Sequence, residues 1–111
     1  MDLRLDHLYR ETHHWDDSVA WWTNLGFRFT NQWGDEPHRA GTLVNAGTEV
    51  VLAEVPADTE PSSTTFLATD DIDGFAGRLG TTVEDTHWGT QMVTAVDPDG
   101  RTYNIEREAP E

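Results

Sequence analysis

A histidine and a tyrosine stand two positions apart near the start of the chain, as His7 and Tyr9 in MDLRLDHLYRE. The alternation of apolar and polar residues here predicts a strand over residues 3–11. Side chains two positions apart on a strand share a face, so the imidazole and the phenol point to the same side. His7 is therefore a candidate general base, or a hydrogen-bond donor to a ligand. The alternative is a structural histidine held by neighbouring polar groups.

Two tryptophans, Trp33 and Trp88, each end a predicted strand and precede a glycine, and an offset of 55 residues relates the two places. Two indoles in such positions can form the walls of a groove that stacks a planar ligand. The alternative is symmetric packing at the ends of strands. The remaining tryptophans lie on or beside a predicted helix, where we expect them to pack in the core; they are Trp15, Trp21 and Trp22.

The tryptophan pair belongs to a repeat that runs through the chain. An offset of 54 carries Asp17, Trp21, Leu25 and Gly26 onto Asp71, Phe75, Leu79 and Gly80. Each half predicts a strand, a helix and three further strands, which makes the repeat unit a βαβββ module. A module of about 50 residues can hardly bury a core alone, so we expect both in a single domain, 1–111, with a pocket between them. We place module one at about 1–55, a linker at about 56–63 and module two at about 64–111.

Turn and cap residues give the expected element boundaries. Asp16-Asp17-Ser18 and Asp70-Asp71 are N-cap formers that predict two helix starts, and Gly26 and Gly80 predict the helix ends. The turn Asp97-Pro98-Asp99-Gly100 predicts a hairpin before the last strand. The expected strands, besides the first, are 27–33, 38–45, 49–55, 64–69, 82–87, 90–96 and 102–107.

The chain of 111 residues has a net charge of −14 and contains neither cysteine nor lysine. Disulfides and thiolate chemistry are therefore excluded, and the charge argues against nucleic acid or an anionic membrane as a partner. The acidity has two readings, adaptation to a salt-rich host or attraction of a cationic ligand. No segment has the character of a signal peptide or a membrane span, so we expect a soluble cytoplasmic protein.

The repeat, with DHL in the first strand, SVAWWTNLGF at the first helix exit, DDIDGFAGRLG in the second helix and the terminal VDPDGRTYNIE, resembles the vicinal oxygen chelate superfamily. This superfamily includes glyoxalase I, extradiol dioxygenases, fosfomycin-resistance enzymes and bleomycin-resistance-type binding proteins. The resemblance implies an α+β fold of two βαβββ modules, whose curved mixed sheets form around a cavity with the helices on the outside. It also implies a homodimer.

The resemblance also implies where a metal would be held. The four ligand positions of metal-dependent members fall on His7, Val51, about Thr64 and Asn104. Only His7 is a strong ligand for a divalent transition metal, so the site is expected to hold no metal. An alternative set combines His7 with Glu49 and Glu106, each two residues from a family position on the same strand face. A shift of two residues moves a side chain by about 7 Å along a strand.

The sequence thus predicts a metal-free protein of the bleomycin-resistance type, without a cofactor, that sequesters an aromatic or amphipathic small molecule. Stacking and desolvation would supply the affinity. The alternative is a glyoxalase-like lyase or isomerase, or a dioxygenase, that uses His7 with or without a divalent metal. A third possibility is a structural or regulatory partner with no small ligand. The expected ligand contacts are His7, Tyr9, Trp33, His38, Trp88, Met92, Asn104 and Glu106.

Overall fold

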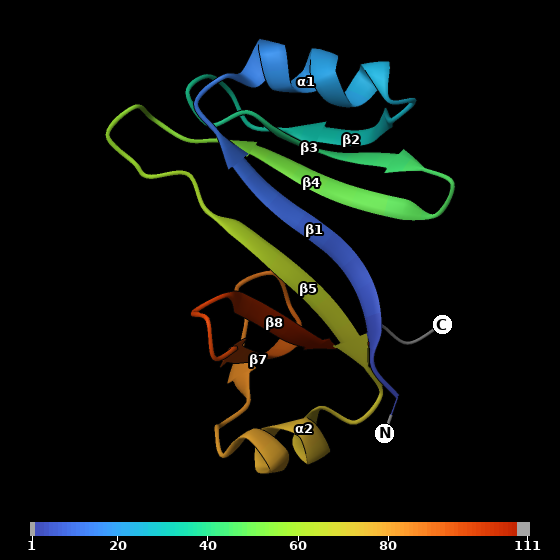
Figure 1. Cartoon of the computed structure of the whole chain (residues 1–111), viewed down its shortest axis with the longest axis vertical. Helices are drawn as coiled ribbons and strands as arrows, with labels where there is room; N and C mark the ends of the chain where they lie inside the picture. Colours follow the sequence, from blue (N-terminus) through green and yellow to red (C-terminus); the bar gives the residue numbers. More distant parts are fainter. Residues whose placement is uncertain (1, 109–111) are drawn as a thin grey trace. The chain divides into compact units, whose positions relative to one another are not determined.

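The computed structural model describes residues 2–108, which contain two helices and eight strands (Figure 1). Parallel and antiparallel strand pairs both occur, so the predicted α+β class with a mixed sheet is confirmed. The helices are α1 (Trp15–Asn24) and α2 (Ile72–Leu79). The strands are β1 (Arg4–Thr12), β2 (Arg28–Trp33), β3 (Ala40–Asn45), β4 (Thr48–Glu54), β5 (Ser63–Thr69), β6 (Glu84–Asp85), β7 (Gln91–Val96) and β8 (Thr102–Arg107).

The chain forms two compact units. Unit 1 consists of Met1–Asp6 and Thr64–Glu111, and unit 2 of His7–Ser63. The boundary falls within β1, which therefore contributes its first residues to unit 1 and the rest to unit 2. The strand order is β2-β3-β4-β1 in unit 2 and β5-β8-β7-β6 in unit 1.

In unit 2, α1 covers one face of the sheet (Figure 1). β1 runs parallel to β4, and β3 pairs antiparallel with both β2 and β4. The core on the α1 side contains Trp15, Phe27, Leu43, Val50 and Leu52. Side chains alternate along a strand. The residue between Val50 and Leu52 on β4, and the residues on either side of Leu8 on β1, therefore point to the face opposite α1.

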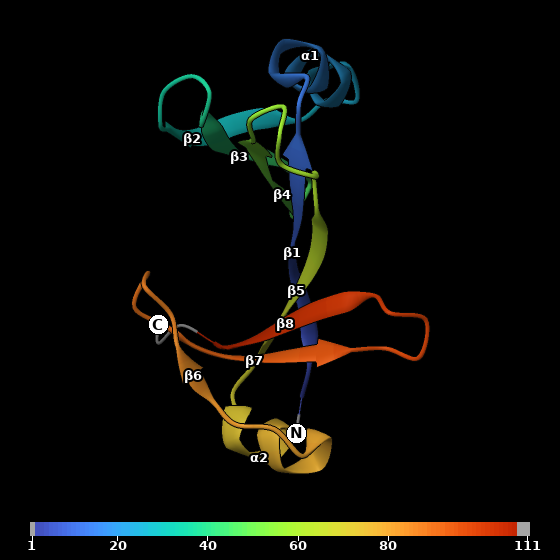
Figure 2. The same ribbon diagram turned by 90° about the vertical axis from the view of Figure 1, so that its left-hand side faces the viewer.

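Unit 1 repeats this plan with α2 beneath its sheet (Figure 2). β5 runs parallel to β8, and β7 pairs antiparallel with β6 and β8. The core between sheet and helix contains Ile72, Ala76, Val93 and Ile105. Val93 and Ile105 are register partners, so the residues on either side of them face away from α2.

Two buried threonines show how closely the units match. Thr12 ends β1 opposite Glu54, and Thr69 ends β5 opposite Arg107. Each threonine hydroxyl accepts a hydrogen bond from the backbone N–H two residues later, at 2.9 Å from His14 and 3.1 Å from Asp71. This turn leads each first strand into its helix, so the strand-to-helix connection is the same in both units.

The helix boundaries agree only in part with the sequence predictions. Asp71 is the N-cap of α2, where its side chain accepts from the Gly74 N–H, and Gly80 ends the helix at φ 67°. For α1 the prediction was wrong, because the helix begins at Trp15 and its N-cap, His14, makes no side-chain cap bond. The acidic pair Asp16 and Asp17 instead occupies the first turn, where its charge favours the helix dipole.

Two further predictions need correction. Trp15 is buried and Trp22 packs against the same core, as expected, but 59% of Trp21 is exposed. Position 21 lies outside the stripe formed by residues 15, 19 and 22 of α1. The strand expected at 82–87 has only two residues in ladder pairing, Glu84 and Asp85. A tight turn follows them, with Thr86 and Thr90 hydrogen-bonded to each other.

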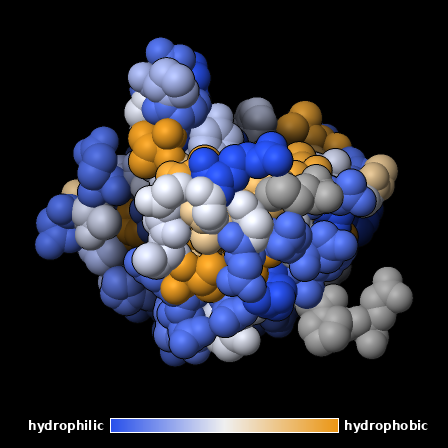
Figure 3. All heavy atoms as spheres, turned by 90° about the horizontal axis from the view of Figure 1, so that it is seen from below, coloured by the Kyte–Doolittle hydropathy of each residue, from blue (hydrophilic) through white to orange (hydrophobic). Residues whose placement is uncertain are grey.

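Hydrophilic residues cover most of the face seen in Figure 3, and hydrophobic atoms form separate patches between them. This distribution agrees with a net charge of −14. Within residues 2–108, no helix has the length and apolar character needed to cross a bilayer.

Candidate functional site

The strongest candidate site is the face of unit 1 that points away from α2. On β7 and β8, Met92 is the register partner of Glu106, and Thr94 is the partner of Asn104. The Thr94 hydroxyl donates to Oδ1 of Asn104 at 3.2 Å. Since Val93 and Ile105 occupy the opposite face, these four side chains, one apolar and three polar, share one surface of the hairpin.

The carboxylate of Glu106 is held in place by two neutral donors. The indole N–H of Trp88 donates to Oε2 of Glu106 at 2.9 Å, and the hydroxyl of Thr90 donates to the same oxygen at 2.6 Å. Thr90 must be the donor, because an ionised carboxylate only accepts. Both donors come from the turn between β6 and β7, and Trp88 is 49% exposed. The structure therefore brings Trp88 and Glu106 together.

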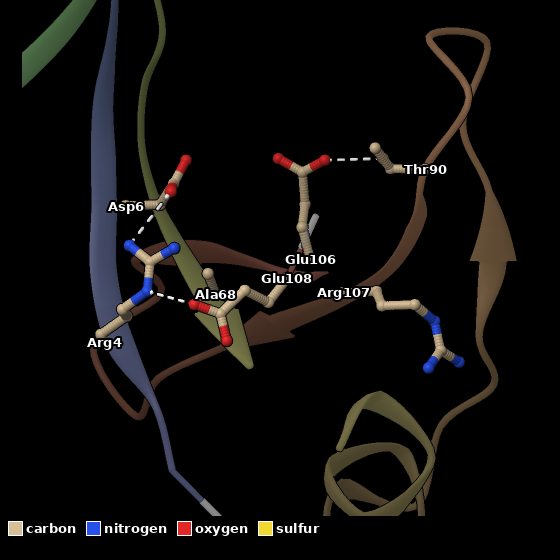
Figure 4. Close-up of a pocket in the computed structure, with 7 residues that line it drawn as sticks. All are labelled: Arg4, Asp6, Ala68, Thr90, Glu106, Arg107 and Glu108. Atoms are coloured by element: carbon tan, nitrogen blue, oxygen red, sulfur yellow. Dashed lines mark hydrogen bonds and ion pairs between the residues drawn. The ribbon is translucent and has the colours of Figure 1, made fainter. Parts of the chain in front are cut away.

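A cavity of about 180 Å³ lies beside Glu106. Figure 4 shows the guanidinium of Arg4 between Asp6 and Glu108, with Glu106 turned toward Thr90. Arg4 contacts Glu108 at 2.9 Å and Asp6 at 3.4 Å. The seven lining residues all belong to unit 1: Arg4, Asp6, Ala68, Thr90, Glu106, Arg107 and Glu108.

The other predicted contacts lie in unit 2. His7 and Tyr9 share the face of β1 opposite Leu8, and the Tyr9 hydroxyl donates to Oε2 of Glu11 at 2.9 Å. Burial and this hydrogen bond raise the pKa of Tyr9 to about 12. Trp33 is 47% exposed at the end of β2, and β3 and β4 separate β2 from β1. The structure therefore does not bring Trp33 next to Tyr9, since three strand spacings amount to about 14 Å.

His38 lies exposed in the turn before β3, near a second cavity of about 320 Å³ at the start of α1. Arg39 lines this cavity. Its Nε donates to Oε1 of Glu54 and its Nη2 donates to Oε2, each at 2.8 Å. The guanidinium also lies 5.7 Å from the ring centre of Trp15. The side-chain hydrogen bond from Arg39 is the main cause that lowers the pKa of Glu54 to about 2. Arg39 thus connects the turn before β3 with Glu54 of β4 and with Trp15 of α1.

One group of possible metal ligands involves His7. Its ring nitrogens and the carboxylates of Asp6 and Glu49 offer one ligand atom each within 4.8 Å of one another. Asp6 and His7 are consecutive on β1, and the β1·β4 register places Glu49 opposite His7. Glu106 was the third member of the set suggested from the sequence, but Asp6 takes that place here.

Comparisons with known proteins reveal a likeness in structure only. No protein-family model matches the sequence, and no curated protein matches it. A glyoxalase/bleomycin resistance protein/dioxygenase superfamily member from Vibrio splendidus aligns over 96% of this chain and 100% of its own, with 16% identity and a TM-score of 0.76. A hypothetical protein from Bacillus halodurans aligns over 100% of this chain and 98% of its own, with 10% identity and a TM-score of 0.74.

The chain has the vicinal oxygen chelate fold. A 2,2′,3-trihydroxybiphenyl 1,2-dioxygenase from Sphingomonas wittichii also shares it, with 16% identity and a TM-score of 0.63 over 94% of this chain and 42% of the dioxygenase. This chain therefore spans less than half of that enzyme.

The strand registers test the superfamily ligand positions. In the vicinal oxygen chelate fold of this chain, Val51 is the partner of Tyr9 and Asn104 is the partner of Phe66. Val51 and Asn104 therefore occupy equivalent places, as the repeat predicted. Val51 offers no donor atom, and the Asn104 amide accepts from Thr94. The residues at these positions do not fit the metal set of the superfamily.

The sequence predicted Trp88, Met92, Asn104 and Glu106 as ligand contacts, but it did not single out the residues that surround Glu106. Thr90 was seen only as a strand start, and Arg4 and Asp6 only as part of the first strand. The signal that was available is the hairpin register from the Asp97–Gly100 turn, which continues from Val96 and Thr102 back to Met92 and Glu106. No local pattern predicts that Arg4 meets Glu108, because 104 residues separate them in the chain.

Proposed function

We propose that this chain binds an aromatic or amphipathic small molecule, without a metal, on the unit 1 face that carries Trp88, Met92, Asn104 and Glu106. The hydrogen bond from Trp88 to Glu106 is the observation that carries this proposal. It joins an exposed indole to a fixed carboxylate at the rim of a cavity of about 180 Å³. An apolar ring next to a few oriented polar groups is typical of small-molecule sites.

The partial exposure of Trp88 and Met92 supports ligand binding on the same face. Trp88 is 49% exposed although its N–H is already bonded, so the ring has apolar surface that a ligand can cover. Met92, half-buried beside Glu106, offers a deformable thioether that adapts to ligand shape. Stacking on Trp88 and contact with Met92 would supply affinity, while Glu106 and Asn104 would orient the ligand.

The experiment follows the indole N–H resonance of Trp88 by NMR while quinoline, a planar molecule that is neutral at pH 7, is added. Trp88→Phe assigns the resonance. We expect a saturable shift of the Trp88 signal and weaker quinoline binding in the Trp88→Leu variant. Trp21→Leu is the matched control, because this exposed tryptophan lies on α1 of unit 2. A response limited to other indoles, or equal binding by Trp88→Leu, would contradict the proposal.

The contacts predicted in unit 2, His7, Tyr9, Trp33 and His38, lie outside this face, and their part in ligand binding stays a separate prediction. The homodimer is also a prediction. Sedimentation of the purified protein tests the dimer. The same measurement at low and at molar salt tests whether the charge of −14 reflects a salt-rich host.

A second candidate function, a metal-assisted lyase, isomerase or dioxygenase, is favoured by one observation. Asp6, His7 and Glu49 offer three ligand atoms within 4.8 Å. One imidazole and two carboxylates could hold a divalent cation, which would supply Lewis-acid chemistry. Titration with Zn²⁺, followed by the His7 ring resonances, is the test. Saturation at one ion per chain that disappears in Glu49→Gln would favour this function, and unchanged His7 resonances would remove it.

A further inference from the structure

We propose that the ligand of the unit 1 face carries a positively charged N–H group, an ammonium or a guanidinium, which binds Glu106 inside the cavity beside Arg4. This inference rests on the proposed function and names its ligand class. It follows from the charges, the bonded atoms and the size of the cavity.

The charges of the lining residues leave one carboxylate uncompensated. Three carboxylates, those of Asp6, Glu106 and Glu108, face two guanidinium groups. Arg4 is bound to Asp6 and Glu108 at 3.4 and 2.9 Å. Arg107 turns toward α2 (Figure 4) and lies 2.7 Å from Gln91 and 3.8 Å from Asp73. Among residues 2–108, no cation lies within ion-pair distance of Glu106, so its negative charge is available to a ligand.

The hydrogen bonds to Glu106 also leave one of its carboxylate oxygens able to accept from a ligand. The donors from Trp88 and Thr90 both end on Oε2, and Oε1 takes part in neither bond. A carboxylate has about four acceptor sites, so Oε1 can accept two hydrogen bonds. The two neutral donors fix the carboxylate without neutralising it. A charged N–H donor would therefore meet a pre-oriented acceptor, which lowers the entropic cost of binding.

The cavity has room for the charged group. Its volume is about 180 Å³. A guanidinium, an amidinium or a short alkylammonium fits this space. The exposed ring of Trp88 next to Glu106 then receives the apolar part of the ligand and attracts the cation through its π face.

The experiment compares three probes of nearly equal shape, benzamidine as cation, benzamide as neutral analogue and benzoate as anion. Their binding to the wild-type protein is measured at one salt concentration by the Trp88 indole shift. We expect benzamidine to bind at least tenfold more tightly than benzamide, because a charge-assisted bond replaces a neutral one. Benzoate should bind most weakly. Higher salt should weaken benzamidine binding and leave benzamide binding nearly unchanged.

Glu106→Gln removes the charge and keeps the shape and an acceptor for Trp88 and Thr90. We expect this variant to lose the tenfold preference for benzamidine while still binding benzamide. Glu60→Gln is the matched control, because it removes the same charge from an exposed linker residue of unit 2. It should keep the preference.

Equal affinity of wild-type protein for benzamidine and benzamide would overturn this inference and leave the proposed function standing. Absence of any Trp88 response, to these probes and to quinoline, would overturn both. A preference for benzamidine that survives in Glu106→Gln would show that another carboxylate binds the cation. If Glu106→Gln fails to fold, the wild-type comparison still tests whether the ligand of this face carries a positive charge.

Discussion

Glu11 and Glu106 lie in the same pair of parallel strands of the two units, but Glu11 is on its first strand and Glu106 is on its last. Glu11 of β1 is the register partner of Ala53, and Glu106 of β8 is the partner of Ala68. Both oxygens of Glu11 accept bonds from its own unit, Oε1 from the Ser62 N–H and hydroxyl at 2.9 and 2.8 Å, and Oε2 from Tyr9. In Glu106, only Oε2 accepts such bonds, from Trp88 and Thr90. The two carboxylates thus differ, because both oxygens of Glu11 are bonded within unit 2 whereas Glu106 lines a cavity of unit 1.

The structural role of Glu11 can be measured at Ser62. Glu11→Ala removes the acceptor of the Ser62 N–H, and a hydrogen bond to a charged group contributes about 1.5–3 kcal/mol. We expect hydrogen exchange of the Ser62 amide to become at least tenfold faster, with the exchange of core strands β4 and β8 unchanged. Glu60→Ala, in the same linker, is the control. Unchanged exchange at Ser62 would show that Glu11 does not hold the linker.

Two glycines of α2 should respond in opposite ways to alanine. A Cβ on Gly77 has no neighbour within 4 Å, so Gly77→Ala should stabilise the protein by about 0.5–1 kcal/mol. A Cβ on Gly74 would collide with the Asp71 carboxylate, whose bond caps the helix. We therefore expect Gly74→Ala to give no gain or a loss in urea unfolding. In an Asp71→Ala background the same substitution should stabilise, and a loss there would contradict the steric explanation.

Acid should reveal the pair formed by Arg39 and Glu54. The pKa of Glu54 falls from 4.5 to about 2 in the folded protein, chiefly through the hydrogen bonds from Arg39. A lowered folded-state pKa gives stability that is present above pH 4.5 and lost as the pH falls toward 2. Wild type should therefore be more stable than Glu54→Gln near neutral pH, and the difference should shrink through this range. Urea unfolding at several pH values measures it, with Glu60→Gln as control, and a pH-independent difference would exclude the ionic explanation.

At high pH, ionisation of Tyr9 should lower the stability of the folded protein. Burial, and then the bond to Glu11, raise its pKa from 10.0 to about 12. The contribution of Tyr9 to stability is full below pH 10.0 and is lost as the pH rises through about 12. Phenolate absorbance in a Tyr103→Phe background follows this single group. We expect a midpoint near 12, lower but still above 10.0 after Glu11→Ala, whereas a midpoint at 10.0 would show an exposed phenol.

The sequence predicted the elements with strong local signals. The strand at 102–107 follows a Pro-Gly turn and was predicted with both ends correct, and Asp71 caps α2 as expected. The prediction failed where local side-chain hydrogen bonds override the preference expected from residue type. His14 became the N-cap of α1 because the Thr12 hydroxyl binds its N–H. The expected strand 82–87 became a turn because Thr86 and Thr90 bond to each other rather than extend the ladder.

The candidate site could be predicted only as separate residues. The spacing of two residues on a strand placed Asn104 and Glu106 on one face, and the repeat drew attention to Trp88. That Trp88 binds Glu106 depends on a turn geometry that no spacing rule gives. Arg4 and Glu108 come from opposite ends of the chain, so their pairing depends on the assembled sheet.

The alanine at position 53 has a consequence for stoichiometry. A duplicated architecture would ordinarily present two equivalent binding places per chain. Ala53, however, stands where its counterpart Glu106 carries a charge, and the nearby Glu11 is occupied by Ser62 and Tyr9. A cationic ligand should therefore saturate each chain at a ratio of one to one.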